Sequence, residues 1–220
     1  MRINQAIAQA TGMSRRAADA AIEQGRVTIN GRPAQFNDRP EPTDILALDG
    51  TPITTTVKTM TIMLHKPVGY VVSRDGQGSP TIYTILPAQY HALKPIGRLD
   101  KDSSGLLLLT NDGKLANSLT HPSQRKTKVY CVTLDAPLQP LHRQMISDHG
   151  IQLDDGLSRL HLERIHGNDD TSWQVTMHEG RNRQIRRTFA ALGYVVVTLH
   201  RIQFGDYYLH DLKPTMFTVV

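Results

Sequence analysis

The chain has 220 residues, with 25 lysines and arginines against 20 acidic residues, ten histidines and one cysteine. This length suits one large domain, or a medium domain joined to a small one. A single cysteine excludes internal disulfides and any metal site with several cysteine ligands. No apolar run approaches the roughly 18 residues of a membrane-spanning helix, and residues 1–6 lack the apolar core of a signal peptide. We therefore expect a cytoplasmic protein that does not bind membranes.

The net charge of +5 is unevenly placed along the chain. Residues 1–60 carry seven basic and six acidic side chains, a net of +1, whereas residues 61–220 carry 18 and 14, a net of +4. Basic side chains cluster at Arg15-Arg16, at residues 125–128 and at residues 181–187. Any one such cluster is usually a solvated surface, but three of them in a small protein favour a nucleic acid as the partner.

The first 50 residues are predicted to form a small, helix-rich unit. Apolar side chains at helical spacing over residues 3–10 predict a first helix. Ser14 is a suitable N-cap for a second helix, which runs to about Gln24. Short strands are expected at residues 27–29 and 45–48, where apolar residues precede turn-forming pairs.

Arg15 and Arg16 fall in the first turn of the second predicted helix, where cations oppose the helix dipole. Two arginines at a helix N-terminus suit a phosphate ligand, and solvent-screened surface residues are the alternative. Residues 14–31 resemble the RNA-binding domain named after ribosomal small-subunit protein S-four. The resemblance covers about the first 50 residues, and we expect Arg15, Arg16 and Arg26 to bind RNA.

The rest of the chain is predicted to be rich in strands. The threonine-rich residues 51–60 are interpreted as a linker that runs into a strand at residues 60–64. Further β-rich runs occur at residues 68–72, 106–109, 129–134, 173–177 and 195–199. This order of elements indicates a small α-rich module followed by a larger α+β domain.

Residues 97–105 form a polar loop bounded by glycines, and the leucine run Leu106–Leu109 follows it. The length of the run and its flanking turn residues favour a buried strand. Asp100 on this loop would be positioned by a rigid scaffold, which suits catalysis. A purely structural turn aspartate is the alternative.

The segment at residues 97–113, GRLDKDSSGLLLLTNDG, resembles the signature of the RsuA/RluB/RluE/RluF family of ribosomal RNA pseudouridine synthases. Three further motifs of that family occur in the family's order, at residues 66–70, 128–130 and 179–187. Together with the N-terminal module, the resemblance covers essentially the whole chain.

The resemblance implies an RNA-binding domain at residues 1–58 and a pseudouridine synthase domain at residues 59–220. The second domain is expected to be built on a mixed, largely antiparallel sheet with flanking helices and loops, so the fold class is α+β. The resemblance also implies that Asp100 is the catalytic aspartate, that Tyr130 packs on the target base, and that Arg186 is the basic partner of the aspartate.

Elementary chemistry makes these roles reasonable. The reaction needs an ionised carboxylate at the sugar, and a nearby cation keeps it ionised. In a helix predicted over residues 182–192, Arg186 borders the apolar face and can reach inward. Uracil inside a stacked helix is unreachable, so the base must be flipped out onto an aromatic surface such as Tyr130, although a strand tyrosine is more often a core residue.

Detaching uracil and rejoining it through a ring carbon requires no redox change or group donor, so we expect no cofactor. The histidines are scattered, and we expect no metal site. Within the second domain, the residues expected to bind RNA are Arg98, Lys128, Arg181, Arg183 and Arg187.

The expected partner is ribosomal RNA or a pre-ribosomal particle, bound by a monomer. The form of residues 102–111 resembles the branch of the family that acts on the large subunit, so we expect large-subunit RNA as the substrate, with small-subunit RNA as the alternative. A non-catalytic RNA-binding factor is a second reading. An RNA methyltransferase would need a glycine-rich loop between a strand and a helix to hold its methyl donor. This reading is disfavoured because the nearby glycines Gly76 and Gly78 are followed by Ser79-Pro80. A glycosidase using Asp100 and Asp102 is disfavoured because no aromatic sugar platform accompanies them.

Overall fold

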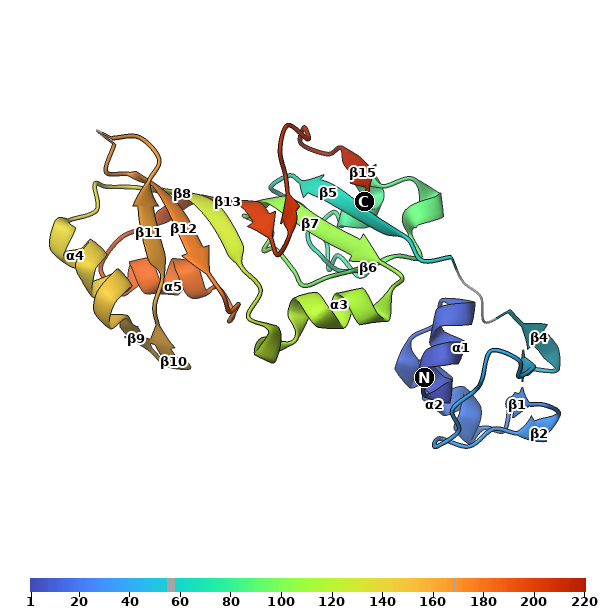
Figure 1. Ribbon diagram of the computed structural model, residues 1–220. Helices are drawn as coiled ribbons and strands as arrows, with labels where there is room; N and C mark the ends of the chain where they lie inside the picture. Colours follow the sequence, from blue (N-terminus) through green and yellow to red (C-terminus); the bar gives the residue numbers. More distant parts are fainter. Residues whose placement is uncertain (55–57, 168) are drawn as a thin grey trace. The chain divides into compact units, whose positions relative to one another are not determined.

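The computed structural model describes residues 1–54, 58–167 and 169–220. The chain divides into two compact units, Met1–Thr59 and Met60–Val220, which are shown in Figure 1. Each unit has a hydrophobic core of its own. None of the helices in the described ranges is long and apolar enough to cross a membrane.

The first unit packs two helices and a small antiparallel sheet around one core. The helices are α1 (Ile3–Thr11) and α2 (Arg15–Glu23), as predicted. The Ser14 hydroxyl accepts a hydrogen bond from the Ala17 amide and caps α2. The strands are β1 (Val27–Ile29), β2 (Arg32–Pro33), β3 (Leu46–Leu48) and β4 (Thr51–Ile53), in the order β2-β1-β3-β4.

Strand β4 corrects the interpretation of residues 51–60 as a linker. The turn at Asp49-Gly50, where both residues have positive φ, returns the chain onto β3, so that Ile53 pairs with Leu46. Threonine and isoleucine favour such extended pairing. Residues 55–57, in the middle of the predicted linker, lie outside the described ranges.

The second unit is built on a mixed sheet whose main path has the order β11-β12-β8-β13-β7-β5-β15 (Figure 1). All neighbours on this path are antiparallel except β13 and β7, which run parallel, and this confirms the predicted α+β class and largely antiparallel sheet. The strands are β5 (Thr61–Lys66), β7 (Ser104–Thr110), β8 (Lys128–Leu134), β11 (His161–Arg164), β12 (Ser172–Met177), β13 (Val196–Phe204) and β15 (Phe217–Val219), with β6 (Lys94–Pro95) beside β7 and β14 (Tyr207–Tyr208) beside β13.

Strand β7 lies between β13 and β5 in the sheet and is buried on both faces. Leu107 and Leu109 join the larger core, and Leu106 and Leu108 join a second core on the opposite face, as the alternation of strand side chains requires. The second core includes Leu119 of α3 (Gly113–Thr120). The leucine run is therefore the buried strand that its composition predicts, and it anchors the loop that precedes it.

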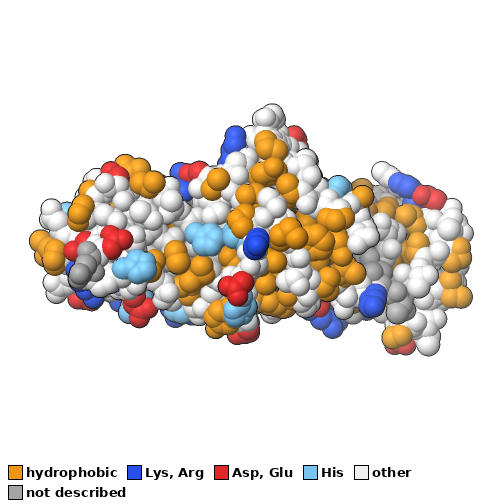
Figure 2. All heavy atoms as spheres, turned by 90° about the horizontal axis from the view of Figure 1, so that it is seen from above, with side chains coloured by type: hydrophobic (Ala, Val, Ile, Leu, Met, Phe, Trp, Pro, Cys, Tyr) orange, Lys and Arg blue, Asp and Glu red, His pale blue; other side chains and the backbone are white. Residues whose placement is uncertain are grey.

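Shorter elements surround the sheet. They are the helices α4 (Pro140–Gln144) and α5 (Gln184–Ala190), the π-helical turn η4 (Met145–His149), the 3-10 turns η1 (Ile82–Ile85), η2 (Ala88–Tyr90) and η3 (Pro122–Gln124), and the hairpin of β9 (Ile151–Leu153) and β10 (Gly156–Ser158). On the face shown in Figure 2, lysine and arginine side chains are scattered and hydrophobic ones gather near the middle of the view.

Two of the predicted segments of the second unit differ in the structure. Residues 68–72 form no strand in the described chain apart from a single bridge of Val71 to Thr81, because Gly69 turns the backbone with a φ of 89°. The helix predicted over residues 182–192 is shorter, since Arg183 adopts a left-handed φ of 45° and α5 starts after it.

Candidate active site

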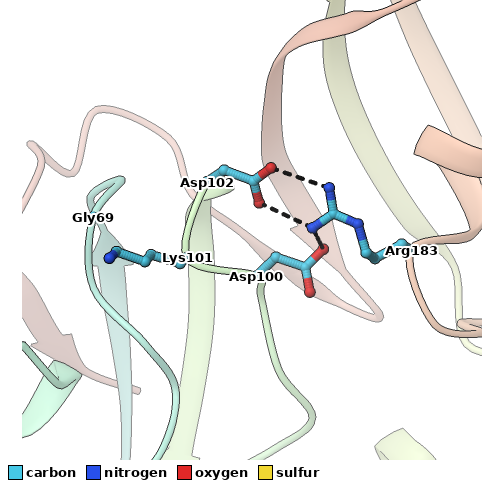
Figure 3. Close-up of a pocket in the computed structure, with 5 residues that line it drawn as sticks. All are labelled: Gly69, Asp100, Lys101, Asp102 and Arg183. Atoms are coloured by element: carbon cyan, nitrogen blue, oxygen red, sulfur yellow. Dashed lines mark hydrogen bonds and ion pairs between the residues drawn. The ribbon is translucent and has the colours of Figure 1, made fainter. Parts of the chain in front are cut away.

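Asp100 lies where two hollows of the second unit meet. One is a cleft of about 1270 Å³ that is also lined by Tyr130 and Arg183. The other is a smaller hollow of about 560 Å³ on the side of Gly69 and Lys101, drawn in Figure 3. The carboxylate of Asp100 lines both hollows and is 37% exposed, on the loop between β6 and the buried strand β7.

The side chain of Lys66, the last residue of β5, fixes the backbone of this loop. Lys66 is completely buried, and its ammonium donates to the carbonyl oxygens of Pro67 at 3.0 Å, Asp100 at 3.0 Å and Ser103 at 2.6 Å. Burial lowers the pKa of Lys66 to about 8, and the negative charges of Asp100 and Asp102 oppose the shift. Three carbonyls on one ammonium hold both ends of residues 100–103 in place.

Gly105 allows the close approach of β7 and β13 behind the loop. Its φ is 106°, and a Cβ atom there would lie 2.2 Å from the Arg201 carbonyl oxygen. No other residue type fits this position without moving the backbone. Gly105, the last residue of the polar loop, therefore permits the close contact between the backbones of β7 and β13.

Arg183 is the cation that faces the Asp100 carboxylate. Its Nη1 lies 3.6 Å from Asp100 Oδ2, and its Nη2 lies 3.3 Å from Asp102 Oδ2. Figure 3 shows the guanidinium opposite both carboxylates, with Lys101 directed away from them. The separation from Asp100 is an ion-pair distance rather than a hydrogen bond, so the carboxylate keeps its oxygens available.

Arg186 occupies a different place from the one expected for it. It pairs with Asp102 Oδ2 at 3.2 Å and donates to the carbonyl oxygens of Asp102 at 3.0 Å and Val196 at 2.6 Å. Within the described residues it makes no ion pair with Asp100, and its role as basic partner of the aspartate stays a prediction. Arg186, in the first turn of α5, bonds backbone oxygens of the loop and of β13, whereas Arg183 precedes the helix and stays 45% exposed against 12% for Arg186.

Tyr130 lies on β8, on the wall of the same cleft as Asp100. Its side chain is largely buried and packs with Val132 in the larger core. Strand alternation places Lys128 on the same face as Tyr130, and Lys128 also lines the cleft. The tyrosine therefore borders both the core and the cleft that Asp100 also lines.

The other arginines expected to bind RNA fall into two groups. Arg15 and Arg16 are exposed in the first unit, and Arg98 lines the cleft of the second. Arg26, Arg181 and Arg187 already have acidic partners, namely Asp49 for Arg26, Asp155 and Glu179 for Arg181, and Asp154 and Asp155 for Arg187.

Two residues of this region were not singled out as site residues from the sequence. Lys66 stands in one of the recognised motifs, and its signal was a lysine at the end of an apolar strand, before Pro67. Arg201, a buried cation in the cleft wall, has no local signal beyond its place at the end of an apolar run. In the described ranges, no group of three or more histidine, cysteine or acidic side chains is placed to hold a metal ion.

Comparison with known proteins identifies the class first. The sequence model described as RNA pseudouridylate synthase matches residues 60–191, and that of the S4 domain matches residues 1–46. The chain therefore belongs to the RNA pseudouridylate synthase family and carries an S4 domain in its first unit, which confirms the resemblance inferred from the motifs.

Individual relatives extend the match over both units. The chain is 35% identical over 216 residues to the ribosomal small subunit pseudouridine synthase A of Pasteurella multocida, covering 96% of this chain and 91% of the relative. It is 36% identical over 223 residues to the ribosomal large subunit pseudouridine synthase B of Escherichia coli strain K12, covering 93% and 74%. A crystal structure of a pseudouridylate synthase matches with a TM-score of 0.71 at 33% identity, covering 100% and 96%.

Proposed function

We propose that this protein isomerises a uridine of ribosomal RNA to pseudouridine, with Asp100 as the catalytic aspartate. The observation that carries the proposal is the Asp100 carboxylate itself, which is accessible in a cleft shared with Tyr130 while its backbone carbonyl is bonded to buried Lys66. A fixed backbone and an accessible carboxylate are what a group acting on a bound sugar needs.

In the proposed reaction, the bond between the ribose and the uracil nitrogen breaks, the base turns, and a ring carbon bonds to the same ribose carbon. The proton on that ring carbon is released and the ring nitrogen gains one, so the atoms balance without a donor or an oxidant. Asp100 acts as the nucleophile or base at the sugar. Arg183, with its Nη1 3.6 Å from Asp100 Oδ2, places a positive charge beside this carboxylate.

Tyr130 is proposed to pack on the flipped uracil. Because its ring is anchored in the core while it lines the cleft, it offers an ordered surface for a base removed from its stack. Arg98, in the same cleft wall, is proposed to hold the displaced strand. Arg186 is proposed to act on the loop through its bonds to Asp102 and Val196 rather than on the substrate.

The proposed substrate is a uridine in large-subunit ribosomal RNA. Residues 102–111 favour that branch, and the Escherichia coli relative named above is a large-subunit enzyme. Small-subunit RNA is the second candidate, because the relative from Pasteurella multocida is a small-subunit enzyme of similar identity. The exposed Arg15 and Arg16 of the S4 domain are proposed to contact RNA phosphates.

Mapping pseudouridines in ribosomal RNA from cells with and without this gene tests the proposal. We expect one uridine of the large-subunit RNA to remain unmodified in the deleted strain and to be restored by the wild-type gene. Restoration by a gene carrying Asp100→Ala contradicts the role of Asp100. A missing site in small-subunit RNA contradicts the choice of subunit, and an unchanged map contradicts the proposed substrate.

A further inference from the structure

Arg201 is a buried cation with a donor that the protein leaves unused. It lies on β13, is 2% exposed, and donates from Nε to the Leu106 carbonyl oxygen at 2.8 Å. Its Nη2 is buried without a hydrogen-bond partner. Within the described residues, Arg201 makes no ion pair.

A second cation, Lys128, shares this part of the cleft wall. Its ammonium lies 5.4 Å from the centre of the Phe204 ring, and the Arg201 guanidinium lies 4.9 Å from the same ring. Lys128 donates to the Glu179 carbonyl oxygen at 3.2 Å and also makes no ion pair within the described chain. Burial and then the positive charge of Arg201 lower the pKa of Lys128, and Glu179 opposes the shift.

Two partly desolvated like charges without a carboxylate between them are unfavourable. The guanidinium carbon of Arg201 lies 6.0 Å from the centre of the Tyr130 ring. Cation–π attraction to the Tyr130 and Phe204 rings offsets part of this cost, but a ring face does not replace a full negative charge. It also leaves the Nη2 hydrogen bond unmade. The arrangement therefore fits an anion with acceptor oxygens.

The place of the pair in the cleft suggests which anion. Lys128 and Arg201 line the same cleft as Asp100 and Tyr130. A nucleotide that is flipped out of its stack brings its flanking phosphodiester groups with it. Guanidinium and ammonium groups are the usual protein partners of such phosphates.

We propose that Lys128 and Arg201 form a subsite for one of the two phosphodiester groups that flank the target uridine. This proposal rests on the proposed function, since it takes RNA as the ligand. Arg201 is in this view a positioning residue: by holding the phosphate it sets the ribose against Asp100. It differs from the exposed basic residues of the surface because its charge is already desolvated when the RNA arrives.

The first test changes the RNA and leaves the protein intact. Oligonucleotides that span the mapped uridine carry a neutral methylphosphonate either on its 5′ side or on its 3′ side, and their Kd for wild-type protein is compared with that of the unmodified RNA. We expect one of the two linkages to weaken binding by about 10- to 100-fold, the usual range for a lost charged hydrogen bond. Equal, small effects of both linkages overturn the proposal.

The second test couples that linkage to the protein. The Lys128→Met protein is expected to bind the unmodified RNA more weakly than wild type does. It should bind the sensitive methylphosphonate RNA as well as wild type does, because that RNA already lacks the phosphate charge that Lys128 would contact. Independent effects that simply multiply contradict a shared contact. Lys114→Met, an exposed lysine outside the cleft lining, is the control and should keep the full difference between the two RNAs.

Arg201→Lys is the matching variant for the buried cation, and circular dichroism and thermal unfolding show whether it folds, because Arg201 also bonds Leu106. A folded Arg201→Lys protein should lose the same linkage preference. The binding measurements do not depend on turnover. Absence of pseudouridine in the wild-type reaction therefore contradicts the proposed function, whereas intact turnover by a wild-type protein that shows no linkage effect contradicts this subsite.

Discussion

The ammonium of Lys66 lies 3.0 Å from the carbonyl oxygen of Asp100, so the candidate catalytic residue is tied by its backbone to a charge that has no contact with solvent. The same ammonium bonds the carbonyls of Pro67 and Ser103. The side chain of Asp100 takes no part in this contact and remains in the cleft.

Replacing Lys66 tests this anchor. Lys66→Met leaves three carbonyl oxygens without their donor, and we expect the free energy of unfolding to fall by about 3 kcal/mol. Urea unfolding measures the change. Lys101→Met is the control, because Lys101 is exposed on the same loop and its loss should cost less than about 0.5 kcal/mol. Equal effects of the two variants contradict the anchoring role.

The carboxylate itself is tested by Asp100→Ala. We expect pseudouridine formation to fall below detection in a single-turnover assay, while the Kd for RNA changes less than about threefold, because the carboxylate contributes to the reaction rather than to phosphate binding. Asp102→Ala provides a matched control on the same loop and should retain measurable turnover. Turnover by the Asp100 variant would exclude it as the catalytic group.

Arg183 and Arg186 are expected to respond differently. Arg183→Met removes the charge facing Asp100 and should lower the single-turnover rate by about 10²-fold, with little effect on stability because the side chain is exposed. Arg186→Met removes bonds to two backbone carbonyls and should also lower the free energy of unfolding by about 2 kcal/mol. A large loss of rate without a loss of stability in Arg186→Met, together with a normal rate in Arg183→Met, would support Arg186 as the basic partner of Asp100.

The S4 domain is tested through the salt dependence of RNA binding. Replacing both Arg15 and Arg16 by Gln should weaken binding to every RNA and reduce the slope of log Kd against log salt by about 2, because each phosphate contact releases counterions. Arg26→Gln should change the slope less, since Asp49 already neutralises Arg26 in a two-point ion pair. An unchanged slope in the double variant would show that Arg15 and Arg16 only face solvent.

His200 gives the protein a predicted pH dependence of stability. Burial, and then the neighbouring His65, lower the pKa of His200, which hydrogen-bonds Ser104 at 2.8 Å. Below a pH of about 6.5 the unfolded chain binds the proton more readily than the folded one. The stability that His200 contributes is therefore full above that pH and is lost as the pH falls.

The measurement is the free energy of unfolding of wild type minus that of His200→Gln, followed from pH 7.5 to 5. We expect the difference to decline as the pH falls. A difference that is independent of pH would mean that His200 has the same pKa in the folded and unfolded chains.

Local sequence determined most of the helices and strands, and the class, of this protein. The alternation of buried side chains in β8 and the unbroken leucine run of β7 follow from periodicity and composition, and Ser14 and Gly12 bound the first helices as their chemistry dictates. These features depend on neighbours within a few residues. The family motifs, which are also local, identified the synthase correctly.

Only the tertiary structure decided which charges meet. Lys66 reaches Asp100 across 34 positions, and Arg186 reaches Asp102 across 84, because β5, β7 and β13 are adjacent in the sheet. Helical spacing placed Arg186 facing inward but not against a particular carboxylate, since α5 begins only after the left-handed turn at Arg183. The unused donor of Arg201 likewise exists only because β13 lies beside β7 and buries it. Long charged side chains take partners that strand order and register bring within reach, and no local pattern encodes that choice.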